Sequence, residues 1–395
     1  MNPYRIAPPP RWWPPALKPA LVRLLRPYRY WRRILEQRVV EVEIRGAERV
    51  ARPLGRKQGV LITPNHPTHA DALAMYEAAD QAGCPFYFMA TWNIFDVRTL
   101  VGRKVLQWHG VFSVDREGTD LRAFRQAVKI VQNERYPLVI FPEGEVYHCN
   151  DRVTPFREGA AVVALSAAKR AQRPVVCVPC ALKYEYIEDP TAELLRSMAE
   201  LERHIHWRPR EDLPLPQRIY KFAEAAMALK EMEFYGHATP GSLPDRIDAL
   251  AREILQRLEQ RRQVDPGGST VPERVKQLRR VSLDRLENTS PDDPQYVQLN
   301  NDLDDLFLVV QLFSYPGDYV AERPSIERLG ETISKFEEDV LGKKRSIFRS
   351  TRRVTVCFGE PIEVQPNPDR KAAARELTDT LEHRVQEMLD RHAAG

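Results

Sequence analysis

The chain has 395 residues, of which 43% are hydrophobic and 29% charged, so a large core can form in one domain with an insertion or in two domains. No apolar run reaches the length of a transmembrane helix, and the first residues lack a secretory signal pattern, so we expect a cytoplasmic setting. The odd number of cysteines, five, favours reduced thiols. Cys177 and Cys180 form a CxxC pair, which by itself is weak evidence for zinc or redox chemistry. Because the pair lies within a buried-strand pattern, we expect structural cysteines.

Positive charge is concentrated in residues 1–38, although the net charge is only +4. Nine basic side chains stand there against the single acid Glu36, with tryptophans, tyrosines and a short leucine stripe between them. This combination favours contact with an anionic membrane surface. A helix docked on the protein contains the same ingredients and stays an alternative. Nucleic acid binding is the weaker interpretation, and we expect no nucleic acid partner.

Strand and helix patterns alternate from residue 39 to residue 187. This alternation predicts a layered α/β domain with a central mixed sheet flanked by helices. The expected strands are 39–44, 59–65, 85–90, 111–116, 136–144 and 174–184, and the expected helices are 70–83, 99–110, 120–133 and 158–170.

The pattern changes at residue 188, after which the chain is charged and almost entirely helical to about residue 350. A strand with a glycine turn follows at 352–364, and an amphipathic helix follows at 370–392. A lone strand after a helical block is expected to rejoin the earlier sheet. We therefore predict one domain from residues 39–187 and 351–395, with 188–350 as an all-helical insertion.

The stretch "LITPNHPTHADALAMY" places two histidines and an aspartate between a buried strand and a helix. His66 and Asp71 are five residues apart, so they can meet only if His66 lies in the turn before the helix. Pro67 supports this arrangement, because proline is favoured at the first helical position and keeps the preceding residue out of helical angles. His69 has no carboxylate at a similar spacing, and we expect it at the helix surface or a pocket wall.

A histidine held in this way is a candidate general base. The carboxylate fixes the tautomer and leaves the other ring nitrogen free to take a proton, while the helix N-terminus disfavours the imidazolium. With no serine or cysteine nucleophile in the local pattern, the pair suits deprotonation of a substrate hydroxyl. A purely structural turn histidine is the alternative for this motif alone.

Two strand ends downstream carry further polar residues. Arg116 ends "GVFSVDR" and could bind a phosphate through two parallel hydrogen bonds, or form an ordinary surface salt bridge. Glu143 and Gly144 end "VIFPEG", where they could position an acceptor hydroxyl or form an ordinary turn. A fourth buried strand carries Pro179. Ligands of open α/β sheets bind at such strand ends.

These four features, in this order, resemble the glycerophospholipid acyltransferase family, typified by 1-acylglycerol-3-phosphate acyltransferases. The family's first block, Asn-His-x-Ser/Thr-x-x-Asp, corresponds to "NHPTHAD" here, its second to "GVFSVDR" and its third to "FPEG". Its fourth block is a hydrophobic strand with a proline, and "VCFGEPIEV" is similar to its closing strand. The resemblance covers residues 39–187 and 352–393.

The resemblance implies a layered acyltransferase fold and a role in phospholipid biosynthesis or remodelling. An acyl group would move from acyl-CoA or acyl-carrier protein to a lysophospholipid hydroxyl, with no metal or cofactor. His66 would be the general base and Asp71 would orient it. Arg116 would bind the phosphate of the acceptor. The remaining residues that the resemblance implies at the substrate site are Glu143, Gly144, Asn65, Thr68, Gly110 and Phe112.

One departure from the family pattern concerns the acceptor. Family members that act on lysophosphatidate often have Thr-Arg-Ser after the glutamate and glycine, whereas this chain has Glu145, Val146 and Tyr147. A cation is lost and an anion gained, for which Arg152 or Arg157 could compensate. Two alternatives therefore stay open: an acyltransferase for a lipid acceptor without a terminal phosphate, and a catalytically inactive lipid-binding protein.

Overall fold

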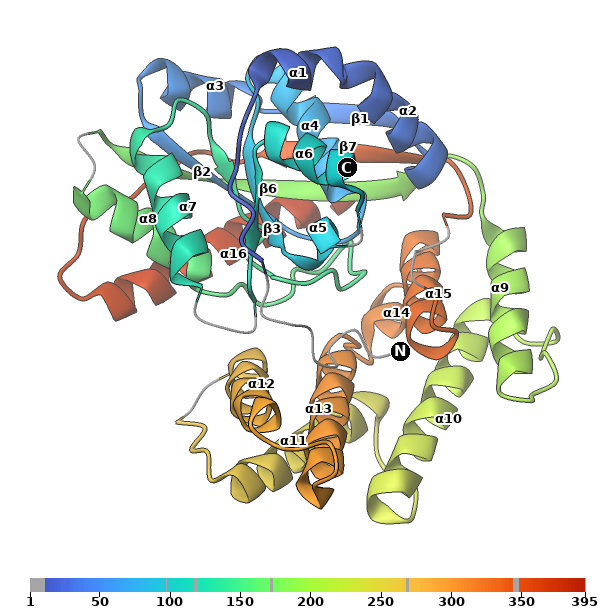
Figure 1. Ribbon diagram of the computed structural model, residues 1–395. Helices are drawn as coiled ribbons and strands as arrows, with labels where there is room; N and C mark the ends of the chain where they lie inside the picture. Colours follow the sequence, from blue (N-terminus) through green and yellow to red (C-terminus); the bar gives the residue numbers. More distant parts are fainter. Residues whose placement is uncertain are drawn as a thin grey trace. The chain divides into compact units, whose positions relative to one another are not determined.

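The computed structural model describes residues 11–96, 98–116, 120–170, 173–267, 270–343 and 348–394 (Figure 1). The chain forms two compact units. The sheet unit consists of Arg11–Glu193 and Arg345–Gly395, and the helical unit of Leu194–Lys344. The sequence placed the edges of the helical insertion at residues 188 and 350. The segment expected to stand apart, residues 1–38, belongs to the sheet unit from Arg11 onward, and residues 1–10 lie outside the described residues.

An eight-stranded mixed sheet forms the centre of the sheet unit, so the expected α/β class is confirmed (Figure 1). Its order is β1-β7-β6-β2-β5-β3-β4, with β8 paired to β6. The pairs among β2 to β6 are parallel, whereas β7 and β8 run antiparallel to β6. The strands are β1 Val39–Arg45, β2 Gly59–Pro64, β3 Tyr87–Thr91, β4 Val111–Val114, β5 Leu138–Val139, β6 Val175–Tyr186, β7 Arg352–Phe358 and β8 Ile362–Glu363.

The strand that follows the helical unit rejoins the sheet, as predicted. β7 lies between β1 and β6, parallel to the first and antiparallel to the second. Val354 pairs with Val42 on one side and with Tyr184 on the other. The closing strand is therefore an interior strand, and β1 joins the rest of the sheet through it.

Helices cover both faces of this sheet. One core contains residues of α3 and α4, and the other contains residues of α7, α8 and α16. Along β2, Leu61 points into the second core and Ile62 into the first. Because both faces are buried, β2 and the first part of β6 are continuous apolar runs in the sequence. The helices are α1 Pro19–Leu24, α2 Arg26–Gln37, α3 Glu48–Gly55, α4 Asp71–Gln81, α5 Asn93–Asp96, α6 Leu100–Trp108, α7 Leu121–Asn133, α8 Gly159–Arg170 and α16 Arg370–Ala394.

The helix expected at 70–83 is confirmed as α4, but Pro67 does not start it. The Asp71 carboxylate accepts a hydrogen bond from the Thr68 N–H (3.1 Å) and closes a separate turn between Pro67 and the helix. One expected strand differs from the structure. The strand expected at 136–144 is reduced to Leu138–Val139. Pro142 has no N–H group for a hydrogen bond to a neighbouring strand, and Gly144 turns the chain with a φ of 78°.

The described part of the N-terminal segment packs on the sheet unit. Trp13 exchanges two hydrogen bonds with Ser113 (2.9 and 3.0 Å) and stacks on Phe95. On α2, the buried Arg29 bonds to Asp80 of α4 at 2.8 Å. The inner face of this segment is therefore docked on the sheet unit, as the docked-helix alternative proposed.

The helical unit has hydrophobic cores of its own. The face predicted from Ile247, Leu250, Ile254 and Leu258 is buried, as expected. A buried ion pair also joins Arg218 to Glu202 at 2.6 Å. The helices are α9 Thr191–His204, α10 Leu215–Tyr235, α11 Leu243–Arg262, α12 Val271–Glu287, α13 Pro294–Phe313, α14 Tyr319–Glu322 and α15 Ile326–Val340.

Among the described residues, no helix combines the length and the apolar character needed to cross a membrane.

Close contact between β2 and the end of α7 generates a stability prediction. A Cβ added at Gly59 would lie 2.1 Å from the Val131 carbonyl oxygen, so Gly59→Ala must displace backbone. We expect it to lower the free energy of unfolding by about 1–3 kcal/mol or more in chemical denaturation. Gly55→Ala is the matched control, because nothing lies within 4 Å of its added Cβ. Equal stability of the two variants would contradict this packing.

Candidate active site

His66 lies in the loop between β2 and α4, at the end of the parallel strands where ligands of such sheets collect. Its Nδ1 is 2.7 Å from Oδ2 of Asp71, and its ring stacks on Phe141 with centroids 4.2 Å apart. Because an ionised carboxylate only accepts, Nδ1 carries the proton and Nε2 carries the lone pair. Nε2 has no hydrogen-bond partner within the part of the chain that the structure describes, and the side chain is 22% exposed. The imidazole is thus arranged to accept a proton.

Asp71 is completely buried and is held by three donors. Oδ2 accepts from His66 and from the Thr68 N–H, and Oδ1 accepts from the Tyr184 hydroxyl at 2.8 Å. Three donors offset the cost of burying a charged group. Burial and the nearby Asp71 charge raise the pKa of Tyr184 well above its usual value, which keeps it a donor. Tyr184 stands in the apolar pattern of β6 like a core residue, so no sequence signal marks it as part of this site.

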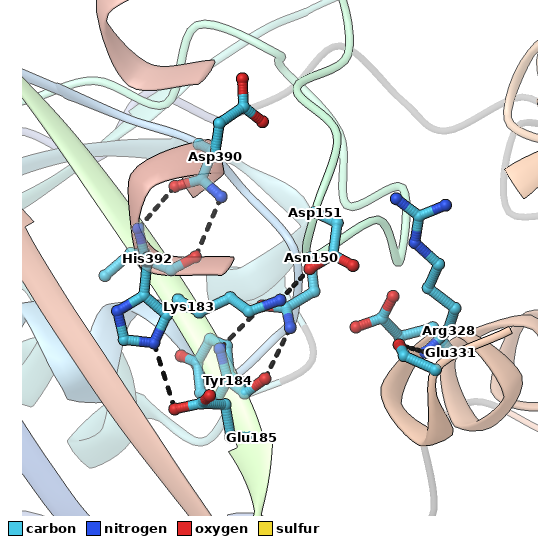
Figure 2. A network of polar contacts seen from close by, with 12 residues as sticks. Asn150, Asp151, Lys183, Tyr184, Glu185, Arg328, Glu331, Asp390 and His392 are labelled. Atoms are coloured by element: carbon cyan, nitrogen blue, oxygen red, sulfur yellow. Dashed lines mark hydrogen bonds and ion pairs between the residues drawn. The ribbon is translucent and has the colours of Figure 1, made fainter. Parts of the chain in front are cut away.

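Two asparagines connect the site loops to β6 in the same way. Asn65 accepts from the Leu182 N–H at 2.7 Å and donates to the Leu182 carbonyl at 3.1 Å. Asn150 makes the equivalent pair with Tyr184, at 2.7 and 2.6 Å, and Figure 2 shows the two residues facing each other. The substrate contact expected of Asn65 stays a prediction, because its amide already bonds to backbone.

The same loop has a further connection to β6. Lys183 forms an ion pair with Asp151, immediately after Asn150 (Figure 2). On the same strand, Glu185 lies 3.2 Å from His392 of α16 (Figure 2). The loop that follows "FPEG" is therefore held against β6 by backbone and charged contacts.

Glu143 is buried against the backbone of the histidine loop. Its Oε1 accepts from the His66 N–H at 2.7 Å, and the carboxyl also accepts from Thr154. Burial raises the pKa of Glu143 to about 8, against the lowering effect of these hydrogen bonds. The contact between Glu143 and His66 joins the first and third sequence blocks. The acceptor contact expected of Glu143 stays a prediction.

Arg116 meets the turn that follows Glu143. Its Nη1 donates to the Gly144 carbonyl at 2.6 Å and lies 2.8 Å from Oε1 of Glu145. Gly144 has a φ of 78°, and an added Cβ would lie 2.8 Å from Cζ of Arg157. The second cation considered in the sequence analysis, Arg157, therefore packs directly on this turn, and its Nε is buried without a hydrogen-bond partner among the described residues.

Other expected site residues lie elsewhere. Gly110 precedes β4, so the full strand of about 13 Å separates it from Arg116. Phe112 is fully buried and packs edge-on against Trp12. His69 is exposed in the turn before α4, as expected of a surface residue. Substrate contacts by Gly110 and Phe112 stay predictions.

The two cysteines of the CxxC pattern cannot share a ligand. Cys177 and Cys180 are both completely buried in β6. Cys177 points into the core of α7, α8 and α16, and Cys180 into the core of α3 and α4. Side chains on opposite faces of a strand do not converge, so this pair is structural.

Residues 41–183 match the family model described as Acyltransferase. The matched segment runs from β1 into β6 and contains the loop of His66 and Asp71, Arg116 and the turn at Glu143. It covers less than half of the chain and ends before the helical unit and β7. A search of curated proteins finds no match. The motif resemblance is thus supported at the level of an acyltransferase-family domain, without an acceptor or donor.

The buried Glu143 generates a pH prediction. Its pKa rises from 4.5 in the unfolded chain to about 8 in the folded one, so the folded state binds the proton more tightly. Its contribution to stability is complete at low pH and is lost as the pH rises through this window, by about 1.4 kcal/mol per pH unit. Glu143→Gln removes this slope. Urea denaturation between pH 5 and pH 8 checks it, and parallel pH profiles for both proteins would contradict it.

Proposed function

We propose that this protein transfers a fatty acyl group from an acyl thioester to a hydroxyl of a glycerolipid. The observation that carries the proposal is the His66 imidazole, bonded to Asp71 through Nδ1 and open at Nε2, within a segment that matches the Acyltransferase family. No serine or cysteine stands in hydrogen-bond contact with His66 among the described residues. A base without a protein nucleophile suits direct transfer to a bound hydroxyl.

The proposed reaction uses His66 as general base. Nε2 takes the proton of the acceptor hydroxyl while its oxygen attacks the thioester carbonyl carbon. The C–S bond then breaks, and the proton returns from His66 to the leaving thiolate. Asp71 remains ionised and stabilises the imidazolium that forms transiently. The atoms balance without a metal or a redox cofactor.

The donor and acceptor follow from the motif resemblance. Acyl-CoA or acyl-carrier protein is the proposed co-substrate, and a lysophospholipid such as 1-acylglycerol-3-phosphate is the acceptor that the resemblance implies. In this proposal Gly144 and Thr68 lie beside the reacting hydroxyl, next to Glu143 and Asp71. Arg116 would bind the acceptor phosphate only if its contact with Glu145 opens.

Substitution of the base tests the reaction. We expect His66→Ala to reduce acyl transfer from labelled acyl-CoA to a lysolipid by about 10²–10⁴-fold, because general base catalysis is lost. Folding should persist, since the ring is partly exposed. His69→Ala is the control, because His69 makes no contact with Asp71 in the described residues. Turnover by His66→Ala close to that of the unsubstituted protein would contradict the role of His66 as the base. No turnover by the unsubstituted protein with any lipid acceptor would favour an inactive lipid-binding protein.

We also propose that the outer face of α2 attaches the protein peripherally to an anionic membrane, where lipid acceptors reside. Tyr28, Trp31 and Leu35 are spaced for one side of a helix, and Trp31 is 58% and Leu35 71% exposed. Leu24 at the end of α1 is exposed too. Arg23 and Arg26 are exposed cations near this stripe, and Arg26 also lies 3.3 Å from Asp80. Exposed aromatic and aliphatic side chains with nearby arginines fit the interface of an anionic bilayer.

Vesicle binding tests this attachment. Trp31→Glu with Leu35→Glu should weaken co-sedimentation with phosphatidylglycerol vesicles by about 10-fold or more, because each buried side chain contributes roughly 1.5 kcal/mol or more. Trp207→Glu is the matched control, since Trp207 is exposed on the helical unit. Unchanged binding of the double variant would refute a role for this face.

A further inference from the structure

Arg116 has a carboxylate from its own chain at the place where the family resemblance expects an acceptor phosphate. The guanidinium Nη1 lies 2.8 Å from Oε1 of Glu145 and donates to the Gly144 carbonyl at 2.6 Å. Both charged side chains are about a quarter exposed, at 24% and 27%. An ion pair this exposed contributes little to folding. Its effect is therefore on the charge that an incoming ligand meets.

The turn that carries Glu145 is fixed from several sides. The Gly144 N–H donates to the Phe141 carbonyl at 3.1 Å, and the Arg157 N–H donates to the Pro142 carbonyl at 2.9 Å. The Arg157 guanidinium lies against Gly144 and hydrogen-bonds to the Tyr147 hydroxyl. Because the backbone immediately before Glu145 is held by these hydrogen bonds, Glu145 stays beside Arg116 unless its side chain rotates away.

This pair opposes a phosphate ligand. A phosphate monoester carries a charge of about −1.5 to −2 near pH 7, and it binds arginine through two parallel N–H bonds. At Arg116 a phosphate would have to displace the Glu145 carboxylate or lie next to that carboxylate. The repulsion between the two negative charges opposes binding. A neutral glycerol or ester oxygen meets no such repulsion.

We infer that Glu145 determines acceptor specificity, and that the acceptor is a hydroxyl-bearing glycerolipid without a phosphate monoester beside the reacting hydroxyl. This inference rests on the proposed acyl transfer at His66, and it replaces lysophosphatidate as the acceptor by a glycerolipid without that phosphate monoester. Glu145 takes the place of the acceptor's phosphate as the counter-ion of Arg116. It acts by excluding the wrong headgroup and takes no part in proton transfer.

The first experiment compares two acceptors that differ only in the phosphate. The full chain is assayed with labelled acyl-CoA and either 1-acylglycerol or 1-acylglycerol-3-phosphate of the same acyl chain. We expect the unsubstituted protein to prefer 1-acylglycerol in kcat/KM by about 10-fold or more. Glu145→Gln should raise kcat/KM for the phosphate acceptor by about 10-fold, mainly through KM. A preference for the phosphate acceptor that Glu145→Gln leaves unchanged would overturn the inference.

Two control variants separate the local carboxylate from total charge. Glu145→Asp keeps the negative charge next to Arg116 and should keep the preference for 1-acylglycerol. Glu48→Gln removes one negative charge from α3, an exposed position that follows β1 at the opposite end of the sheet from His66. It should not relax the preference. If Glu48→Gln raises kcat/KM for the phosphate acceptor as much as Glu145→Gln does, the effect comes from the total charge of the protein and the inference fails.

A binding experiment separates this inference from the proposed reaction. In the His66→Ala background, titration with 1-acylglycerol-3-phosphate in micelles should give about 10-fold tighter binding when Glu145→Gln is added, whereas binding of 1-acylglycerol should not tighten. This result supports the headgroup role of Glu145 even if the unsubstituted protein shows no turnover. Absence of turnover would count only against the proposed acyl transfer. Equal phosphate affinity with and without Glu145→Gln overturns the headgroup role, whatever the turnover.

Discussion

The candidate site depends on one buried carboxylate, Asp71, which joins three parts of the sheet unit. It fixes the His66 ring, closes the turn at Thr68 and accepts from Tyr184 of β6. β6 is held in turn by β7, whose residue Val354 pairs with Tyr184. Because β6 lies between β2 and β7, the orientation of the His66 ring depends on a strand almost three hundred residues further along the chain.

Three carboxyl groups near the site have different surroundings and therefore different properties. Asp71 is buried with three donors, an environment that stabilises a charge. Glu143 is buried, and burial raises its pKa to about 8 although the hydrogen bonds from His66 and Thr154 lower it. Glu145 is partly exposed and meets Arg116 directly. The same functional group thus orients the His66 imidazole, supports a loop and neutralises a cation.

The position of the helical unit in the chain explains why the sheet tolerates it. Tyr186 and Arg352 are paired at the ends of antiparallel strands β6 and β7, and the Ile187 N–H donates to the Thr351 carbonyl at 2.9 Å. The chain therefore leaves and re-enters the sheet unit at neighbouring, hydrogen-bonded positions, where an insertion does not interrupt strand pairing. With hydrophobic cores of its own, the helical unit replaces what would otherwise be a hairpin loop.

Local information in the sequence determined the alternating elements, the return of the strand at 352–358 and the contact of His66 with Asp71, since periodicity and a five-residue separation both act over short stretches of chain. It overestimated β5, because Pro142 and the positive φ of Gly144 turn the chain away from strand pairing. Only the tertiary structure decided that Tyr184 supports Asp71, that Glu145 meets Arg116, and that Arg29 of the basic segment turns inward to Asp80. These contacts join residues from separate elements, and such partners are chosen by the packing of the sheet and leave no periodic signal in either segment.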